Sequence, residues 1–406
     1  MRGQYLWKVV GMVLMGMSLA SPSLAVEDVE IALFVSLSGP VVDLGTMSRD
    51  GAVLAAEDIN NAGGIKALGG AKIKLVIADV TSTPAQGPSV VERTLSTNKV
   101  AAVVGYGTSQ MTLTCLPVSE KAQVPVITGS VADKILQQGY KWIFMNPPRG
   151  THIGATQVKF LSFLRSKYNI PIKKVGFVYE NTAYGVSTAA GTKETAIEEG
   201  FTDIRLYEAY DARFTDASPL VTKIKAAGVD VLFPVSYTTD AMLLLTTMHA
   251  MRVRPLVVGG GAGFIWPDIG KYLGDKVNGV FSVSATNWDV KNIMTDAQRK
   301  SGVERYKKRF GVYMAEQGVE HYGMVWILKE AMEKAGSAHP QKIREALLAA
   351  EFSRGGAGMM QPGKLKFDQT GANTLVHPVM IQWQEGEPRT VYPEEDALRK
   401  VIWPIK

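Results

Sequence analysis

Side chains with metal-binding or nucleophilic chemistry are few and scattered along this sequence. No two of its five histidines stand four residues apart: they are His152, His249, His321, His339 and His377. A zinc site on a helix needs that spacing, with a carboxylate between the two, so we expect no metal ion. Cys115 is the single cysteine and lies in an apolar pattern of helical period, which favours a core position over a nucleophile and leaves no internal disulfide.

Two glycine-rich segments approach nucleotide-binding motifs without completing them. Gly358 to Lys364 reads G-x-x-x-x-G-K, but Leu365 stands where a phosphate loop carries the Mg²⁺-binding Ser or Thr, and a strand pattern follows where a helix should. The run from Gly259 does not complete G-x-G-x-x-G, and no G-x-S-x-G occurs. We therefore expect no cofactor and no catalytic residue.

Small hydroxyl residues and tyrosines collect where predicted strands give way to predicted helices. The junctions of the first half are rich in Ser, Thr and Gly, at 36–40, 105–109 and 129–133, and those of the second half carry aromatic residues, at 180–185, 236–240 and 259–264. In open parallel sheets, ligands bind at such junctions. Hydroxyls and free backbone N–H groups at helix starts suit an anion.

Each of these residues also has a purely structural interpretation. Ser is a favoured N-cap, so Ser109 could simply cap the helix that follows it. Tyr184 and Tyr237 could be packing aromatics at strand ends. The glycines around Gly261 could only shape a turn.

The elements that would position these residues alternate between strands and helices. We predict strands at 31–36, 73–79, 101–105, 124–128, 174–179, 229–235, 256–259 and 280–284, with two more near the end at 363–367 and 375–383. We predict helices at 48–61, 86–98, 111–121, 154–168, 185–199, 217–227, 239–251, 294–310, 319–335 and 340–349. Nearly all-apolar strands between helices predict an α/β fold of two doubly wound parallel sheets, each covered on both faces.

The N-terminal residues 1–25 have the pattern of a cleaved signal peptide. Arg2 and Lys8 precede an apolar run at 9–19, and small residues, Ser23 and Ala25, occupy the −3 and −1 positions. That run is too short to span a bilayer comfortably. No cysteine follows the cleavage site to carry a lipid, so we expect a periplasmic protein beginning near Val26.

The length, composition and net charge of the chain agree with two soluble lobes. The chain has 406 residues, 46% of them hydrophobic, which is enough for two domain-sized cores. Its formal net charge of +6 is spread without a basic block or an aromatic-interleaved stripe, so nucleic-acid binding gains no support.

Several segments together resemble the periplasmic binding proteins of branched-chain amino-acid and amide ABC transporters, which have the type I periplasmic binding fold. The resemblance covers essentially the whole mature chain and rests on the segments 38–40, 58–65, 183–185, 216–231 and 363–368. It implies two lobes joined by three hinge crossings. The N-terminal lobe would comprise 26–148 and 287–373, and the C-terminal lobe 149–286 and 374–406.

The resemblance also implies how a ligand is held. Its carboxylate would be bound by Ser109 and by backbone amides near Ser130, Val131 and Ala132. Tyr184 and Tyr237 would close over the rest of the ligand from the other lobe. The alignment adds three further positions to the pocket lining: Leu44, Tyr106 and Gly261.

Departures from the family pattern affect the predicted ligand. Amino-acid binders of this family usually carry a threonine where Ala132 aligns and a carboxylate where Gly261 aligns, and both groups receive the ligand's ammonium. A buried ammonium without acceptors costs several kcal/mol, so we expect no ordinary α-amino acid unless Asp133 or Asp240 accepts it. Leu44 replaces an aromatic residue, which with Phe264 and Trp266 nearby favours a carboxylate or amide with an apolar or aromatic body.

Three functions fit this pattern to different degrees. The first is a transport receptor whose lobes close on a solute and which docks as a monomer on an ABC permease, and it predicts saturable binding without turnover. The second is a periplasmic sensor or regulator of the same fold, and a neighbouring permease and ATPase gene pair would argue against it. The third is an enzyme with a site assembled from scattered residues, which product formation would reveal.

Overall fold

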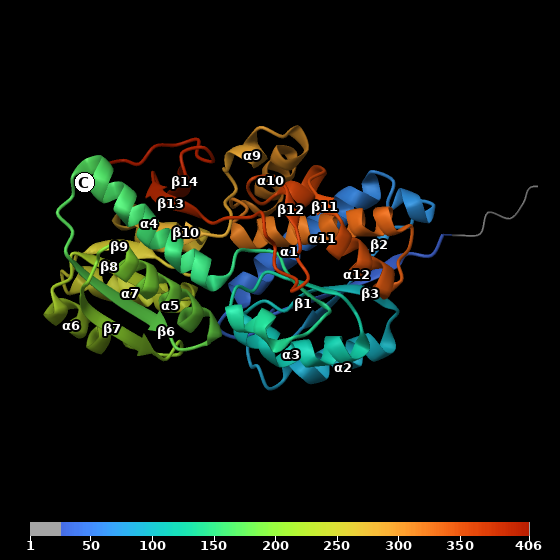
Figure 1. Cartoon of the computed structure of the whole chain (residues 1–406), viewed down its shortest axis with the longest axis horizontal. Helices are drawn as coiled ribbons and strands as arrows, with labels where there is room; N and C mark the ends of the chain where they lie inside the picture. The colour runs from blue at the N-terminus through green and yellow to red at the C-terminus, as the bar shows by residue number, and fades with distance from the viewer. Residues whose placement is uncertain (1–25, 406) are drawn as a thin grey trace, which may run out of the picture.

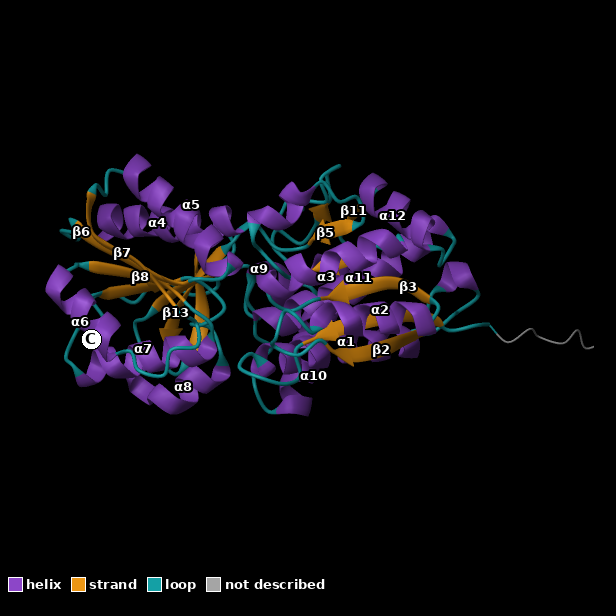
Figure 2. Cartoon of the chain, turned by 90° about the horizontal axis from the view of Figure 1, so that it is seen from below, coloured by secondary structure: helices purple, strands orange, loops and turns teal. Residues whose placement is uncertain are grey.

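The computed structural model describes residues 26–405, so the predicted signal peptide at 1–25 lies outside the described residues. Two β-sheets, each flanked by helices, form two lobes that lie side by side (Figures 1 and 2). Within the described residues, none of the helices combines the length and the apolarity that crossing a membrane requires.

The first lobe is built on a five-stranded sheet in the order β2-β1-β3-β4-β5, and all its pairings are parallel. The strands are β1 (Val29–Val35), β2 (Ile73–Asp79), β3 (Val100–Gly105), β4 (Val126–Thr128) and β5 (Ile143–Met145). Its helices are α1 (Val42–Asn61), α2 (Gly87–Thr97), α3 (Ser109–Ala122), α9 (Lys291–Met294), α10 (Ala297–Phe310), α11 (Glu316–Ala335) and α12 (Pro340–Ala349).

Strand β1 shows why this sheet is covered on both faces. Side chains alternate between the two faces of a strand, and in β1 both sets are apolar. Ile31 and Leu33 pack in the core that α1 and α11 cover. Ala32 and Phe34 pack in the opposite core, with residues of α2 and α3. Cys115 lies in this second core, where burial raises the pKa of its thiol to about 12.

The second lobe is built on a seven-stranded sheet in the order β14-β13-β10-β9-β8-β6-β7. Its parallel strands are β6 (Lys174–Glu180), β7 (Asp203–Tyr210), β8 (Val231–Val235), β9 (Leu256–Gly259) and β10 (Phe281–Ser284). Two antiparallel strands extend one edge, β13 (Val379–Gln384) and β14 (Glu387–Tyr392). Its helices are α4 (Gly150–Tyr168), α5 (Ala183–Glu198), α6 (Ser218–Ala227), α7 (Thr238–Ala250) and α8 (Pro267–Leu273).

The two strands predicted near the end of the chain do not pair with each other. The first of them is β12 (Leu365–Lys366), which pairs with β11 (Glu351–Phe352) in a separate two-stranded sheet. The second is β13, which joins the second lobe. Short 3₁₀ turns complete the chain: η1 (Lys66–Leu68), η2 (Asp133–Gln138), η3 (Gly274–Val277) and η4 (Gly355–Gly358).

The chain passes between the lobes through three neighbouring connections, which follow β5, β10 and β12. Met145, the last residue of β5, forms a parallel bridge with Ala372 of the third connection. Asn373 donates a side-chain hydrogen bond to the carbonyl of Asn146 at 2.9 Å. Gln361 precedes β12 and holds the second connection, because its side chain donates to the carbonyl of Ala285 at 2.6 Å. The predicted lobe boundaries at 148, 286 and 373 lie within these connections and remain predictions.

Helix α11 runs through the first lobe beside α1 (Figure 1). The two helices approach closely at Gly51 of α1 and Gly318 of α11, where a Cβ on Gly51 would lie 2.2 Å from the Gly318 carbonyl oxygen. In the second lobe, a Cβ on Gly154 of α4 would lie 2.2 Å from the Thr188 carbonyl oxygen of α5. Each lobe therefore depends on a glycine at the crossing of two helices.

We expect Gly51→Ala to destabilise the protein by about 1 to 3 kcal/mol, because the added methyl must push backbone away from backbone. Gly323→Ala on α11 is the matched control, since its Cβ would meet its nearest atom at 3.4 Å. Alanine has a higher helix propensity than glycine, so this control substitution should leave the protein's stability unchanged or raise it by up to about 1 kcal/mol. Urea unfolding measures both. Equal stability of the Gly51→Ala variant and the parent would contradict the close crossing.

The first turns of α11 bury an imidazole. His321 is 1% exposed, and its Nδ1–H donates to the Gln317 carbonyl at 2.8 Å. Its Nε2 has no hydrogen-bond partner among the described residues. Burial lowers the pKa of His321 from 6.5 to about 4, so the folded protein holds this side chain neutral at pH 7.

This depressed pKa predicts a loss of stability in acid. Between pH 6.5 and about 4 the unfolded chain binds a proton on His321 that the folded chain does not, so stability falls as the pH falls, by roughly 3 kcal/mol in all. His321→Gln removes this contribution. Urea unfolding at pH 7, 5.5 and 4.5 should therefore show a smaller acid loss in the variant, and parallel losses in both proteins would refute the assignment.

Candidate ligand-binding site

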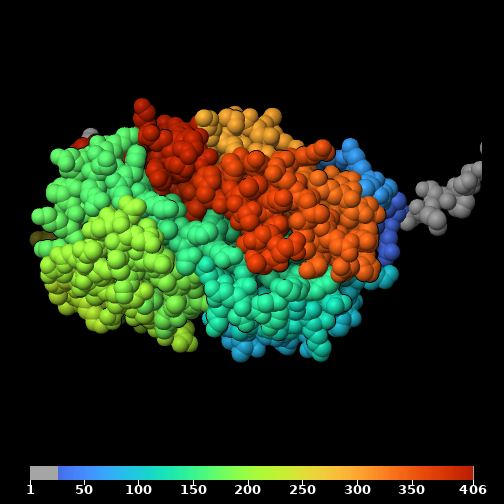
Figure 3. All heavy atoms as spheres, in the orientation of Figure 1, coloured from blue at the N-terminus to red at the C-terminus, as the bar shows by residue number. Residues whose placement is uncertain are grey.

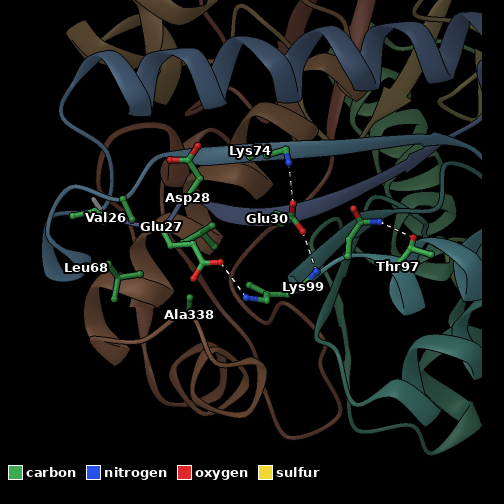
Figure 4. A pocket seen from close by; sticks show the side chains of 13 residues that line it. Val26, Glu27, Asp28, Glu30, Leu68, Lys74, Thr97, Lys99 and Ala338 are labelled. Carbon is green, nitrogen blue, oxygen red and sulfur yellow. Dashed lines mark hydrogen bonds and ion pairs between the residues drawn. The ribbon is translucent and has the colours of Figure 1, made fainter. Parts of the chain in front are cut away.

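A large hollow lies in the first lobe (Figure 4). It has a volume of about 880 Å³ and lies at the amino ends of β1, β2 and β3. Surface ion pairs line it, Lys74 with Glu30 at 3.0 Å and Lys99 with Glu27 at 3.2 Å. Ligand sites of parallel sheets lie at the opposite, carboxyl ends of the strands, so this hollow is not the candidate site.

A second, much smaller cavity lies where the carboxyl ends of the parallel strands of both sheets meet. Its volume is about 30 Å³. The segments that line it follow β3 and β4 of the first lobe and β6, β8, β9 and β10 of the second. The cavity lining includes seven of the nine residues that the sequence predicted: Leu44, Ser109, Ser130, Val131, Tyr184, Tyr237 and Gly261.

The first-lobe wall of this cavity is made of hydroxyls and backbone amides. Thr108 is the N-cap of α3, and its hydroxyl accepts from the Met111 N–H at 3.3 Å. Ser109 is therefore not the capping residue. Its hydroxyl oxygen instead accepts from the N–H groups of Val131 at 3.3 Å and Ala132 at 3.2 Å. These donors converge at the positive end of a 14-residue helix, an arrangement that suits an anion.

The second-lobe wall carries the two predicted tyrosines. The rings of Tyr184 and Tyr237 lie 5.2 Å apart and are tilted by 45°. The Tyr184 hydroxyl donates to the Gly260 carbonyl. Burial raises the pKa of both phenols, so both remain neutral. This wall offers an aromatic surface with few free polar groups.

Glu180 fixes the loop that presents Tyr184. Its carboxylate is fully buried at the end of β6. It accepts three hydrogen bonds: from the Thr182 N–H at 2.7 Å, the Thr182 hydroxyl at 2.8 Å and the Gly185 N–H at 2.6 Å. These bonds satisfy the N-terminus of α5. Tyr184 therefore follows a turn that Glu180 holds by hydrogen bonds.

Two predicted residues are not brought to the cavity lining. The Tyr106 side chain turns into the first-lobe core, where its ring stacks on Phe34 at 5.5 Å and its hydroxyl hydrogen bonds to that of Ser119. Ala132 is 1% exposed and packs in the same core. Its contribution is the backbone N–H bound to Ser109.

The cavity is small because the lobes are in contact around it, and the surface is continuous between them on the face drawn in Figure 3. Leu44 of the first lobe belongs to one apolar cluster with Phe264 and Trp266 of the second. Asp133, also in the first lobe, accepts from the Ser187 hydroxyl at 2.6 Å and the Thr151 hydroxyl at 2.9 Å. The volume equals about one water molecule, so a solute enters only when the two walls separate.

The lining residues that the sequence analysis missed include Glu316 and Gln317. They form the first turn of α11, which the apolar pattern predicted to begin only at residue 319. Glu316 Oε2 accepts from the Ser284 hydroxyl at 2.5 Å and the Ala285 N–H at 2.7 Å. The recurrence of polar residues at 316, 317, 320 and 321 before an apolar helix was the available signal.

No group of three His, Cys, Asp or Glu side chains within residues 26–405 is arranged to hold a metal ion. The polar groups of the cavity are hydroxyls, amides and one carboxyl group, that of Glu316 on α11. No nucleophile in this lining is hydrogen-bonded to a base. This arrangement suits a small molecule held by shape and hydrogen bonds.

Comparisons with known proteins agree with this geometry. A Leu/Ile/Val-binding protein homolog 7 of Brucella suis is 29% identical over 393 residues, covering 95% of this chain and 96% of that protein. The leucine-binding protein LivK of Thermotoga maritima superposes with a TM-score of 0.77 at 20% identity, covering 90% of this chain and 99% of that one. These likenesses confirm the predicted type I periplasmic binding fold.

Two other solved structures contain ligands. LivJ of Streptococcus pneumoniae, in complex with isoleucine, gives a TM-score of 0.76 at 23% identity and covers 90% of this chain and 100% of that one. A solute-binding protein of Rhodopseudomonas palustris, in complex with 3,4-dihydroxybenzoic acid, gives a TM-score of 0.75 at 19% identity. The match covers 89% of this chain and 95% of that one.

The family model described as "Periplasmic binding protein" matches residues 28–386. Its members and the relatives above are solute-binding proteins, which confirms the predicted class of a binding protein in place of an enzyme. This chain belongs to the periplasmic binding protein family.

Proposed function

We propose that this protein is the periplasmic solute-binding component of an ABC importer and captures a small carboxylate- or amide-bearing solute between its lobes. The observation that carries the proposal is the cavity at the carboxyl ends of both sheets, with a wall of hydroxyls and amides facing a wall of tyrosines. The first wall would bind the acid or amide group, and the second would cover the apolar body of the solute.

The donors of the first wall support a carboxylate or amide as the anchoring group. Ser109 accepts two backbone hydrogen bonds, which leaves its own O–H to donate to a solute. The Val131 and Ala132 N–H groups can give up their hydrogen bonds to Ser109 and donate to an approaching anion, because these bonds, at 3.2 to 3.3 Å, are long. Isoleucine and 3,4-dihydroxybenzoic acid, the ligands of two structural relatives, share a carboxylate.

Hinge closure would couple capture to transport. A solute held by both walls favours the closed arrangement, because only there does it contact both lobes at once. The three neighbouring connections between the lobes allow this motion with small changes in few residues. The closed protein would then dock as a monomer on the permease, after export by the signal peptide at 1–25.

We expect a thermal-shift screen of amino acids, amides and aromatic carboxylates to identify solutes that raise the melting temperature by mass action. Ser109→Ala should weaken their binding about tenfold, since it removes a hydrogen bond to a charged group. Thr114→Ala is the control on the same helix, because the Thr114 hydroxyl bonds only within α3. The proposal fails if no carboxylate or amide binds, or if Ser109→Ala and Thr114→Ala bind equally well.

A further inference from the structure

The first turn of α11 brings acceptor oxygens without donors to the cavity. Both hydrogen bonds that Glu316 accepts go to Oε2, and Oε1 receives none from the described residues. The Oε1 of Gln317 is buried and has no hydrogen-bond partner among the described residues. Glu316 is 7% and Gln317 5% exposed. Buried acceptors are normally hydrogen-bonded, so this part of the cavity lining calls for a donor.

The carboxyl group of Glu316 also lacks a cationic partner among the described residues, and burial raises its pKa. Glu316 is the only ionisable carboxyl in the cavity lining, and no Lys, Arg or His is among the lining residues. Neither Glu316 nor Glu320, one turn further along α11, forms a salt bridge with any described residue. A cationic or N–H group on a solute would supply the missing partner.

Other acceptors that the sequence offered are already occupied. Asp133 accepts from Ser187 and Thr151, and Asp240 accepts from the Tyr210 hydroxyl at 2.6 Å. Neither residue lines the cavity. Gly261 does line it, with φ of +85°, but carries no side chain. Glu316 is therefore the carboxyl that the cavity lining offers to a solute, and it comes from α11 of the first lobe.

We propose that Glu316, assisted by Gln317, is the specificity-determining acceptor of the cavity and binds an ammonium or amide N–H group of the solute. This inference rests on the proposed function, because it assumes that the solute's acid or amide group occupies the wall at Ser109. The cavity then has a donor wall on α3 and an acceptor end on α11. A solute with a carboxylate at one end and an N–H donor elsewhere matches both.

The test compares solutes that differ by one amino group: leucine with 4-methylpentanoate, and 4-aminobenzoate with benzoate. We expect the parent protein to bind the amino-bearing member of at least one pair tenfold or more tightly by isothermal titration calorimetry. Glu316→Gln should reduce that preference to below about threefold while changing the affinity for the partner without an amino group by less than about threefold. Gln keeps the size of the side chain and one acceptor oxygen but removes the charge.

Glu330→Gln is the matched control, because Glu330 is a buried carboxyl on the same helix outside the cavity lining. It should keep the full preference. The inference is overturned if the acids without amino groups bind the parent protein as tightly as their partners, or if Glu316→Gln keeps the preference; both results leave the proposed function intact. If no acid of either pair binds, with or without an amino group, the assumption about the solute falls and the inference with it.

Discussion

All strands of a doubly wound parallel sheet end at the same edge, and in this protein the two such edges face each other across one small cavity. The loops that follow β3, β4, β6, β8, β9 and β10 all contribute to its lining. Each lobe must be rigid for these loops to meet at fixed distances. Close helix crossings at Gly51 and Gly154, and apolar cores on both sheet faces, provide that rigidity.

The polar groups behind the cavity lining position the groups in it. Glu180 accepts three hydrogen bonds and so fixes the start of α5 and Tyr184. Thr108 caps α3, which leaves Ser109 available to bind the amides of the neighbouring loop. Groups that face a solute are in this way separated from the groups that complete the helix ends, so that binding a solute need not disrupt either helix.

Sequence patterns predicted the buried elements well because burial on both faces leaves a continuous apolar run. The strand predicted at 101–105 differs by one residue from β3, which is buried throughout, and the limits predicted for β9 agree with the structure. Strand β7 was missed because it lies at a sheet edge, where charged residues such as Arg205 and Glu208 alternate with apolar ones. Strand β5 has only three residues, too few for a pattern.

The candidate site was predicted less evenly, for a related reason. Junctions after apolar strands are visible in a sequence, and most of the predicted lining residues came from them. The direction of a loop side chain is not visible, so Tyr106 was predicted in the pocket although Ser119 and Phe34 hold it in the core. Helix α11 begins with polar residues inside the protein, and a prediction based on apolar periodicity starts the helix too late and omits Glu316.

Under the proposed function, the contacts between the lobes determine how much a solute must contribute to closure. Leu44 packs with Phe264 and Trp266 across the lobe boundary, and Asp133 binds Ser187 and Thr151. These contacts themselves stabilise the closed arrangement. The binding free energy of a solute therefore has to supply only the remaining free-energy difference between the open and closed states. Discrimination then depends on groups that the lobe contacts leave without partners, and Glu316 Oε1 is such a group. A solute without an N–H donor would close the lobes over an unsatisfied carboxyl, which costs free energy and weakens its binding.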